Sequence, residues 1–139
     1  MPEYPNLLGP LLMMIRATEA FSKVNLESNL SHLGRLAFSQ QFRTVRFGVS
    51  KSAGHTETSK QLSEIYRCLY IVKTATRASQ YKGPLLPAIH RASSLIGRLF
   101  DYEVVIFDSV HAHSKGEIKH FYQEVLSRSA KIPIFVLLG

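Results

Sequence analysis

The first third of the chain places apolar residues with helical spacing. Between Leu11 and Phe38 they recur every three or four positions, as one face of an α-helix requires. The segment VNLESNL interrupts the pattern, and Asn25 or Ser28 could cap a second helix there. The pattern therefore predicts an N-terminal helical segment over residues 1–40, made of one helix or two.

Four later segments have the apolar pattern of β-strands. The first, FRTVRFGV, alternates apolar and polar residues from Phe42 to Val49. The segments CLYIVKTA, EVVIFDS and IPIFVLLG are apolar runs, and the last two are typical of strands buried on both faces.

Helices are predicted between these strands. TSKQLSEIYRCLY begins with good N-cap residues and places Leu62, Ile65 and Tyr66 on one face. PAIHRASSLIGRLF begins at Pro87, which suits a first helical turn, and KGEIKHFYQEVLSRSA forms the last helix.

The alternation of helix and strand predicts an α/β fold. Right-handed crossovers would give three layers: a mainly parallel sheet of about four strands with helices on both faces. We expect the strands at Val45 and Val105 to be adjacent or one strand apart. The 139 residues suit a single domain over 1–139, with the N-terminal helical segment at 1–40 and the core at 41–139.

Composition indicates a globular, intracellular protein. Hydrophobic residues make up 45% of the chain and charged residues 19%, which is enough for a packed core. The single cysteine, Cys68, excludes an internal disulfide and a cysteine-based zinc site, and a cytoplasmic location fits. No basic residue precedes the N-terminal apolar stretch, and prolines interrupt it, so we expect neither a signal peptide nor a membrane partner.

The formal net charge of +7 points to an anionic partner, nucleic acid first. The basic residues are dispersed, so charge alone places no site. Two segments, RTVR and KTATRASQYK, nevertheless predict a nucleic-acid surface, for which an ordinary basic loop is the alternative. The residues of this predicted surface are Arg43, Arg46, Lys73, Arg77 and Lys82.

The segment FGVSKSAGHTETSKQL has features of a phosphate-binding loop. Small residues lie between a predicted strand and a predicted helix, so backbone N–H groups and the helix dipole could face a phosphate. Against the pattern G-x-x-x-x-G-K-S/T, Gly54 and Thr56 match, the first glycine is displaced to Gly48, and His55 replaces the lysine. The predicted nucleotide-binding residues are Lys51, Gly54, His55, Thr56 and Thr58.

A second motif lies about fifty residues further along. In VVIFDS, four apolar residues precede Asp108, as in a strand-end carboxylate that holds Mg²⁺. With IPIFVLLG where the next core strand belongs, residues 42–139 resemble the P-loop NTPases, and within them the helicase and terminase motor branch. The resemblance implies ATP or GTP with magnesium as cofactor, and Asp108 and Thr56 as magnesium ligands.

Two departures from the motifs predict a degenerate nucleotide site. His55 is mostly neutral at neutral pH and shorter than lysine, although Lys51 could supply a charge. Ser109 follows Asp108, where catalysis in this fold usually needs a water-orienting carboxylate, and Glu117 lies further along the chain. We therefore expect hydrolysis to be weak or absent.

Three other residues could take part in chemistry. His111 and His113, in HAH, could line a site at the ends of the strands, but a solvated loop is the better interpretation, because no third metal ligand is close in sequence. Cys68 precedes an apolar run and is interpreted as a small buried hydrophobic residue, not a nucleophile.

Three functions are compatible with these features. The leading hypothesis is a basic P-loop-like protein that binds nucleic acid or a nucleic-acid-processing complex. The first alternative is an active ATPase or GTPase with an atypical phosphate loop. The second is an inhibitor or scaffold that binds only protein. The apolar run LLMMI at residues 11–15 exceeds one helical face, so this helix could also form a homo-oligomer.

Overall fold

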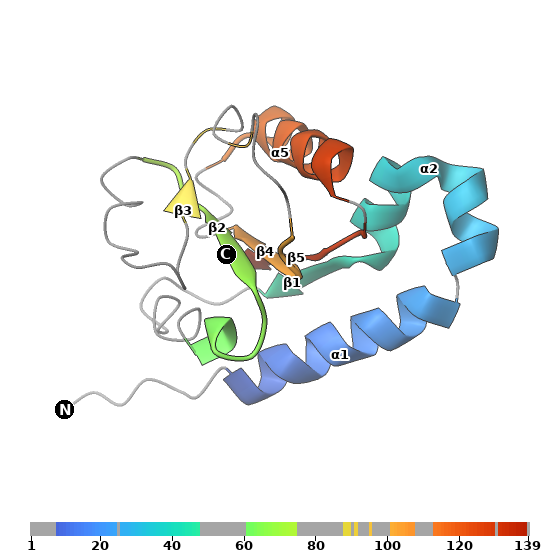
Figure 1. Ribbon diagram of the computed structural model, residues 1–139, viewed down its shortest axis with the longest axis horizontal. Helices are drawn as coiled ribbons and strands as arrows, with labels where there is room; N and C mark the ends of the chain where they lie inside the picture. Colours follow the sequence, from blue (N-terminus) through green and yellow to red (C-terminus); the bar gives the residue numbers. More distant parts are fainter. Residues whose placement is uncertain are drawn as a thin grey trace.

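The computed structural model describes residues 8–24, 26–47, 61–74, 88–89, 91, 95, 101–107, 113–129 and 131–138. These residues include three helices and five strands (Figure 1). The helices are α1 (Leu8–Val24), α2 (Leu26–Phe42) and α5 (Lys115–Arg128). The strands are β1 (Thr44–Phe47), β2 (Cys68–Ile71), β3 (Ala88–Ile89), β4 (Val104–Phe107) and β5 (Ile134–Leu138).

The five strands form one sheet in the order β1-β5-β4-β2-β3, and every pair is parallel. The predicted α/β fold with a parallel sheet is therefore confirmed. Val45 pairs with Val136 of β5, and Val105 of β4 pairs with Phe135 of the same strand. The strands at Val45 and Val105 are thus one strand apart, as predicted.

The sheet has one strand more than the roughly four that the sequence predicted. β3 lies in a segment predicted to be helical from Pro87 onward, which was wrong at residues 88–89. The N–H of Val72 donates to the carbonyl of Ile89 at 2.9 Å, and Ile89 is buried. Two residues are too few for a recognisable alternation, so helical spacing in the surrounding sequence concealed this strand.

The predicted helix before β2 ends earlier than expected. Residues 61–63 are helical, and then the N–H groups of Ile65 and Tyr66 both donate to the carbonyl of Leu62 at 3.0 Å, which closes a turn. Leu62 is fully buried, but Ile65 is 46% exposed and does not share its face. The turn is needed because the chain must reverse before it enters β2 at Cys68.

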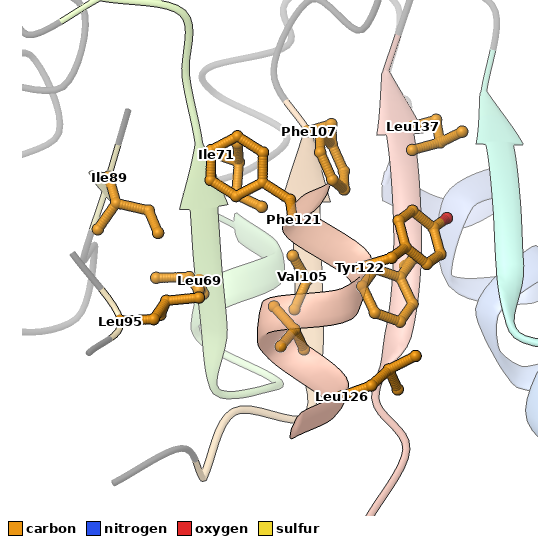
Figure 2. Packing of buried hydrophobic residues seen from close by; sticks show 12 residues of the cluster. Leu69, Ile71, Ile89, Leu95, Val105, Phe107, Phe121, Tyr122, Leu126 and Leu137 are labelled. Carbon is orange, nitrogen blue, oxygen red and sulfur yellow. The ribbon is translucent and has the colours of Figure 1, made fainter. Parts of the chain in front are cut away.

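Helix α5 covers one face of the sheet. Its residues Phe121, Tyr122 and Leu126 point toward side chains of β2, β4 and β5, as Figure 2 shows. The Tyr122 ring stacks on Phe135 with centroids 3.9 Å apart. Its hydroxyl lies 2.7 Å from the hydroxyl of Thr44, and burial raises the pKa of Tyr122 to about 12, so the hydroxyl stays neutral.

Helix α1 covers the opposite face (Figure 1). Leu11 and Ile15 of α1 are buried in one apolar cluster that includes side chains of all four longer strands. The strands therefore lie between two helical layers. This explains why β2, β4 and β5 are apolar at every position: each of their side chains faces one of the two layers.

Helix α2 connects the two layers. Gly34 interrupts it with φ of 82° and ψ of 165°, a backbone conformation that favours glycine. The next residue, Arg35, donates to the carbonyls of Leu126 and Ser129, both at 2.8 Å. These bonds satisfy carbonyl groups at the C-terminal end of α5 and fix α2 beside it.

The stacked pair of Tyr122 and Phe135 should contribute strongly to stability. We expect Phe135→Ala to lower the free energy of unfolding by about 3–5 kcal/mol, because the change leaves a cavity at the centre of the sheet. The exposed Ile65→Ala is the matched control and should cost about 1 kcal/mol or less. Urea unfolding monitored by circular dichroism measures both changes, and equal losses would contradict this packing.

Candidate functional site

The carboxyl ends of the strands lie along one edge of the sheet. Because all strands are parallel, the chain leaves every strand at this edge, which is where open α/β folds bind ligands. β2 ends at Ile71, which pairs with Phe107 at the end of β4. Lys73 follows two residues after Ile71. Helix α5, the next described helix after β4, begins at the same edge.

The sequence fixes the start of α5 locally. Ser114 is the N-cap, and its side chain accepts from the N–H of Glu117 at 3.1 Å. The sequence Ser-Lys-Gly-Glu has the spacing of a capping box. Glu117 also places a negative charge in the first turn, where the helix dipole is favourable to it.

Glu117 joins α5 to the end of β2. The Nζ atom of Lys73 lies 3.0 Å from both Oε1 and Oε2 of Glu117. Donation by Lys73 holds the pKa of Glu117 below its ordinary value, with a smaller contribution from His113, although desolvation opposes the shift. Both side chains are nearly half exposed, so water and salt screen the pair.

His113 lies beneath this ion pair. Its side chain is 1% exposed, and Nδ1 is 3.4 Å from Oε2 of Glu117. The ring meets the rings of Phe107 and Phe121 edge-on, with centroids 6.0 and 6.3 Å away. The interpretation as a solvated loop was therefore wrong for His113, while His111 lies outside the described residues.

Most of the predicted nucleotide-binding and nucleic-acid-binding residues lie outside the part of the chain that the structure describes. Lys51, Gly54, His55, Thr56 and Thr58 lie outside the described residues, and so do Asp108, Arg77 and Lys82. The structure describes the ends of the two strands that precede the phosphate-loop segment and Asp108. β1 ends at Phe47 and β4 at Phe107, and both pair with β5.

The three described basic residues of the predicted nucleic-acid surface do not lie together. Arg43 precedes β1 and is therefore at the amino edge of the sheet. Its guanidinium donates to the Ser22 hydroxyl at 2.9 Å and to the Ile132 carbonyl at 2.7 Å. Burial lowers the pKa of Arg43, although Glu19 opposes the shift. Arg46 is exposed on β1, and Lys73 lies at the carboxyl edge.

A cavity of about 650 Å³ opens at the amino edge, which the sequence did not indicate. Its charged lining residues are Glu19, Arg43, Arg67, Asp101, Glu103 and Lys131. Arg67 and Asp101 form an ion pair at 2.6 Å. Because three carboxylates balance three cations, this cavity is not the strongly positive surface that a nucleic-acid backbone requires.

Within the described part of the chain, we also considered Cys68, possible metal-binding clusters and membrane-spanning helices. Cys68 is 2% exposed, and burial raises its pKa to about 12, which confirms it as a buried small residue. Across the described ranges, no group of three or more histidine, cysteine or acidic residues could hold a metal ion. No helix in those ranges is long and apolar enough to cross a membrane.

Comparison of the chain with protein-family models, with curated proteins and with solved structures finds no match. The strand pairing establishes an α/β domain with a five-stranded parallel sheet, and no family is identified.

The lowered pKa of Glu117 predicts a specific acid sensitivity. The folded pKa lies below the unfolded one, so its contribution to stability is present above the unfolded pKa and is lost as pH falls through the folded pKa. Glu117→Gln should therefore lose less stability than wild type between about pH 5 and pH 3 at low ionic strength.

Lys73→Met provides the matched control, because it removes the main cause of the shift and leaves the carboxylate in place. It should flatten the acid limb of the unfolding curve in the same way as Glu117→Gln. Chemical unfolding at a series of pH values measures the slope, and identical slopes for wild type and both variants would contradict the ion pair.

Proposed function

We propose that this protein binds the phosphate groups of nucleic acid at the carboxyl edge of its sheet, and that its phosphate loop is a degenerate nucleotide site. The observation that carries the proposal is the placement of β1 and β4. They end at the same edge, on either side of β5, at Phe47 and Phe107.

The register of these strands supports a shared site. Phe47 pairs with Leu138 and Phe107 with the neighbouring Leu137, so the two strand ends are offset by one residue. Two strand spacings and this offset separate them by about 10 Å. The phosphate-loop segment and Asp108 therefore leave the sheet from points close enough for one phosphate and its magnesium ion to lie between them.

Lys73 supplies a cation at this edge. It is held by an exposed ion pair with Glu117, and such pairs contribute little net stability because water already screens both charges. A phosphate oxygen can therefore replace the carboxylate of Glu117 at small cost. Glu117 competes with the phosphate for Lys73, so its carboxylate should weaken binding.

The proposal uses only part of the predicted basic surface. Arg43 is excluded, because its guanidinium is half-buried and bonded to Ser22 and Ile132. Lys73 and the exposed Arg46 remain, together with Arg77 and Lys82 from the segment that follows Lys73 in the sequence. Contacts of this kind are made to phosphates and so carry no strong sequence preference.

Salt dependence tests the proposed binding. If about four phosphates are neutralised, the logarithm of the affinity for a fluorescent oligonucleotide should fall against the logarithm of salt concentration with a slope of roughly −3 to −4. Lys73→Ala should weaken binding to all sequences and make the slope shallower by about 1. Arg46→Ala and Arg77→Ala should act in the same direction.

Two further variants separate this site from general charge. Lys131→Ala removes an equal charge from an exposed residue at the opposite edge and should leave the slope unchanged. Glu117→Gln removes the carboxylate that competes for Lys73 and should strengthen binding. No binding at about 50 mM salt, or equal effects of Lys73→Ala and Lys131→Ala, would refute the proposal and favour a protein-binding scaffold.

Nucleotide hydrolysis should be very slow or absent. His55 lacks the lysine charge and Ser109 the water-orienting carboxylate, and each loss should cost on the order of 10²-fold in rate or more. Steady-state phosphate release from ATP and GTP measures this. Turnover near about 1 s⁻¹ that Asp108→Ala abolishes would identify an active NTPase instead.

Nucleotide binding is tested separately with His55→Lys. If only the charge of the phosphate loop is missing, this variant should bind ATP and Mg²⁺ more tightly than wild type does, without gaining rapid turnover. Equilibrium titration with a fluorescent ATP analogue measures the change.

A further inference from the structure

The cavity at the amino edge of the sheet, here called the amino-edge cavity, has no role in the proposed nucleic-acid binding. Its volume of about 650 Å³ lies within the range of pockets that bind small molecules. Its lining residues come from α1 and from the segments that directly precede β1, β2, β4 and β5. Separate parts of the chain therefore converge on one concave surface, as they do in a ligand site.

Arg43 and Lys131 give one end of the amino-edge cavity a surplus of positive charge. The guanidinium of Arg43 donates to the carbonyl of Ile132, the residue that follows Lys131, at 2.7 Å. Burial lowers the pKa of Arg43 and the charge of Glu19 opposes the shift, so this carboxylate compensates the guanidinium. Lys131 is exposed, and no ion pair joins it to another described residue. Its positive charge is therefore left over at this end.

Asp101 and Glu103 give the other end a surplus of negative charge. Arg67 forms an ion pair with Asp101 at 2.6 Å, and its backbone N–H donates to Oε1 of Glu103 at 3.2 Å. One guanidinium thus serves two carboxylates, and one negative charge is left over. Across the described ranges no three acidic, histidine or cysteine residues are placed to hold a metal ion, so these two carboxylates do not form part of a metal site there.

The sheet fixes the separation of the two ends. The N–H of Phe135 in β5 donates to the carbonyl of Arg43 at 2.8 Å. On the other side of β5, the N–H of Ile134 donates to the carbonyl of Glu103 at 3.0 Å. Two strand spacings, about 10 Å, therefore separate the backbones of Arg43 and Glu103. A ligand that contacts their side chains must span somewhat less than this distance.

We propose that the amino-edge cavity binds a dipeptide with free termini and apolar side chains, with its carboxylate beside Arg43 and Lys131 and its ammonium beside Glu103. A ligand without net charge suits a cavity whose charges balance, whereas a phosphate would meet three carboxylates. The two charged groups of an α-amino acid are about 3 Å apart, but the termini of an extended dipeptide are about 7 Å apart, which suits the separation of the two ends better. The inference is independent of the proposed nucleic-acid function.

Apolar residues on the cavity wall favour apolar side chains in the ligand. Tyr102 and Ile132 are half-buried and pack against the core cluster beneath α5, and Pro133 is buried. All three line the cavity. A ligand with apolar side chains would remove more of their remaining surface from water than glycylglycine would.

Titration calorimetry with leucyl-phenylalanine tests the ligand class. Because water screens the charges of exposed groups, we expect a dissociation constant on the order of 100 µM. Acetylation of the amine and amidation of the carboxylate should each raise this constant by roughly threefold to tenfold. Free leucine and glycylglycine should also bind more weakly than leucyl-phenylalanine. Equal affinity for the free and blocked dipeptides, or no binding at about 10 mM, would overturn the proposal.

Two variants test the assignment of the two ends. Lys131→Gln removes the uncompensated cation, so it should lose most of the preference for a free carboxylate over the amide and keep the preference for a free ammonium. Glu103→Gln should have the reverse effect, and the glutamine oxygen can still accept the N–H of Arg67. Lys119→Gln changes an exposed residue of α5 and is the control that should keep both preferences.

The pattern of lost preferences decides between position and overall charge. If Lys131→Gln and Lys119→Gln have the same effect, net charge and not the cavity governs binding, and the proposal is overturned. Loss of the ammonium preference in Lys131→Gln, or of the carboxylate preference in Glu103→Gln, would overturn the assigned orientation. The blocked dipeptides test the wild-type protein directly, so a variant that does not fold leaves the proposal open to refutation.

Discussion

Burial of the sheet on both faces is the constraint on which the rest of this structure depends. β4 and β5 each have parallel neighbours on both sides, and none of their side chains faces water. Such strands are stable only when a helical layer covers each face. The positions of α1 and α5 and the stacking of Tyr122 on Phe135 follow from this requirement, and the hydrogen bonds of Arg35 fix α2 beside α5.

The same constraint confines polar chemistry to the two edges of the sheet. At the carboxyl edge, Lys73, Glu117 and His113 form a cluster that passes from solvent into the apolar core. At the amino edge, Arg43 is bound by Ser22 and a backbone carbonyl, and carboxylates balance the other cations. Two arginines three residues apart in the sequence, Arg43 and Arg46, therefore have different surroundings and different availability to a ligand.

The sequence predicted the fold more fully than the site. Strong signals came from runs such as VVIF and IFVLL, because a strand buried on both faces must be apolar at every position. The sequence did not predict β3, because two residues are too few to show an alternation of apolar and polar positions. The helix near Leu62 ends early because the chain turns there to enter β2, and the position of β2 is set by its pairing in the sheet. Burial of His113 depends on Phe107 and Phe121, which only the fold brings to it.

The two outermost strands have a consequence for assembly. An edge strand displays unpaired backbone groups that can recruit a strand from another molecule and start aggregation. Among the described residues, β3 spans the two residues Ala88–Ile89, and β1 spans the four residues Thr44–Phe47 and carries the charged side chain of Arg46. Short, charged edges are poor templates for a further strand. The sheet is thereby protected against uncontrolled growth by its own outermost strands.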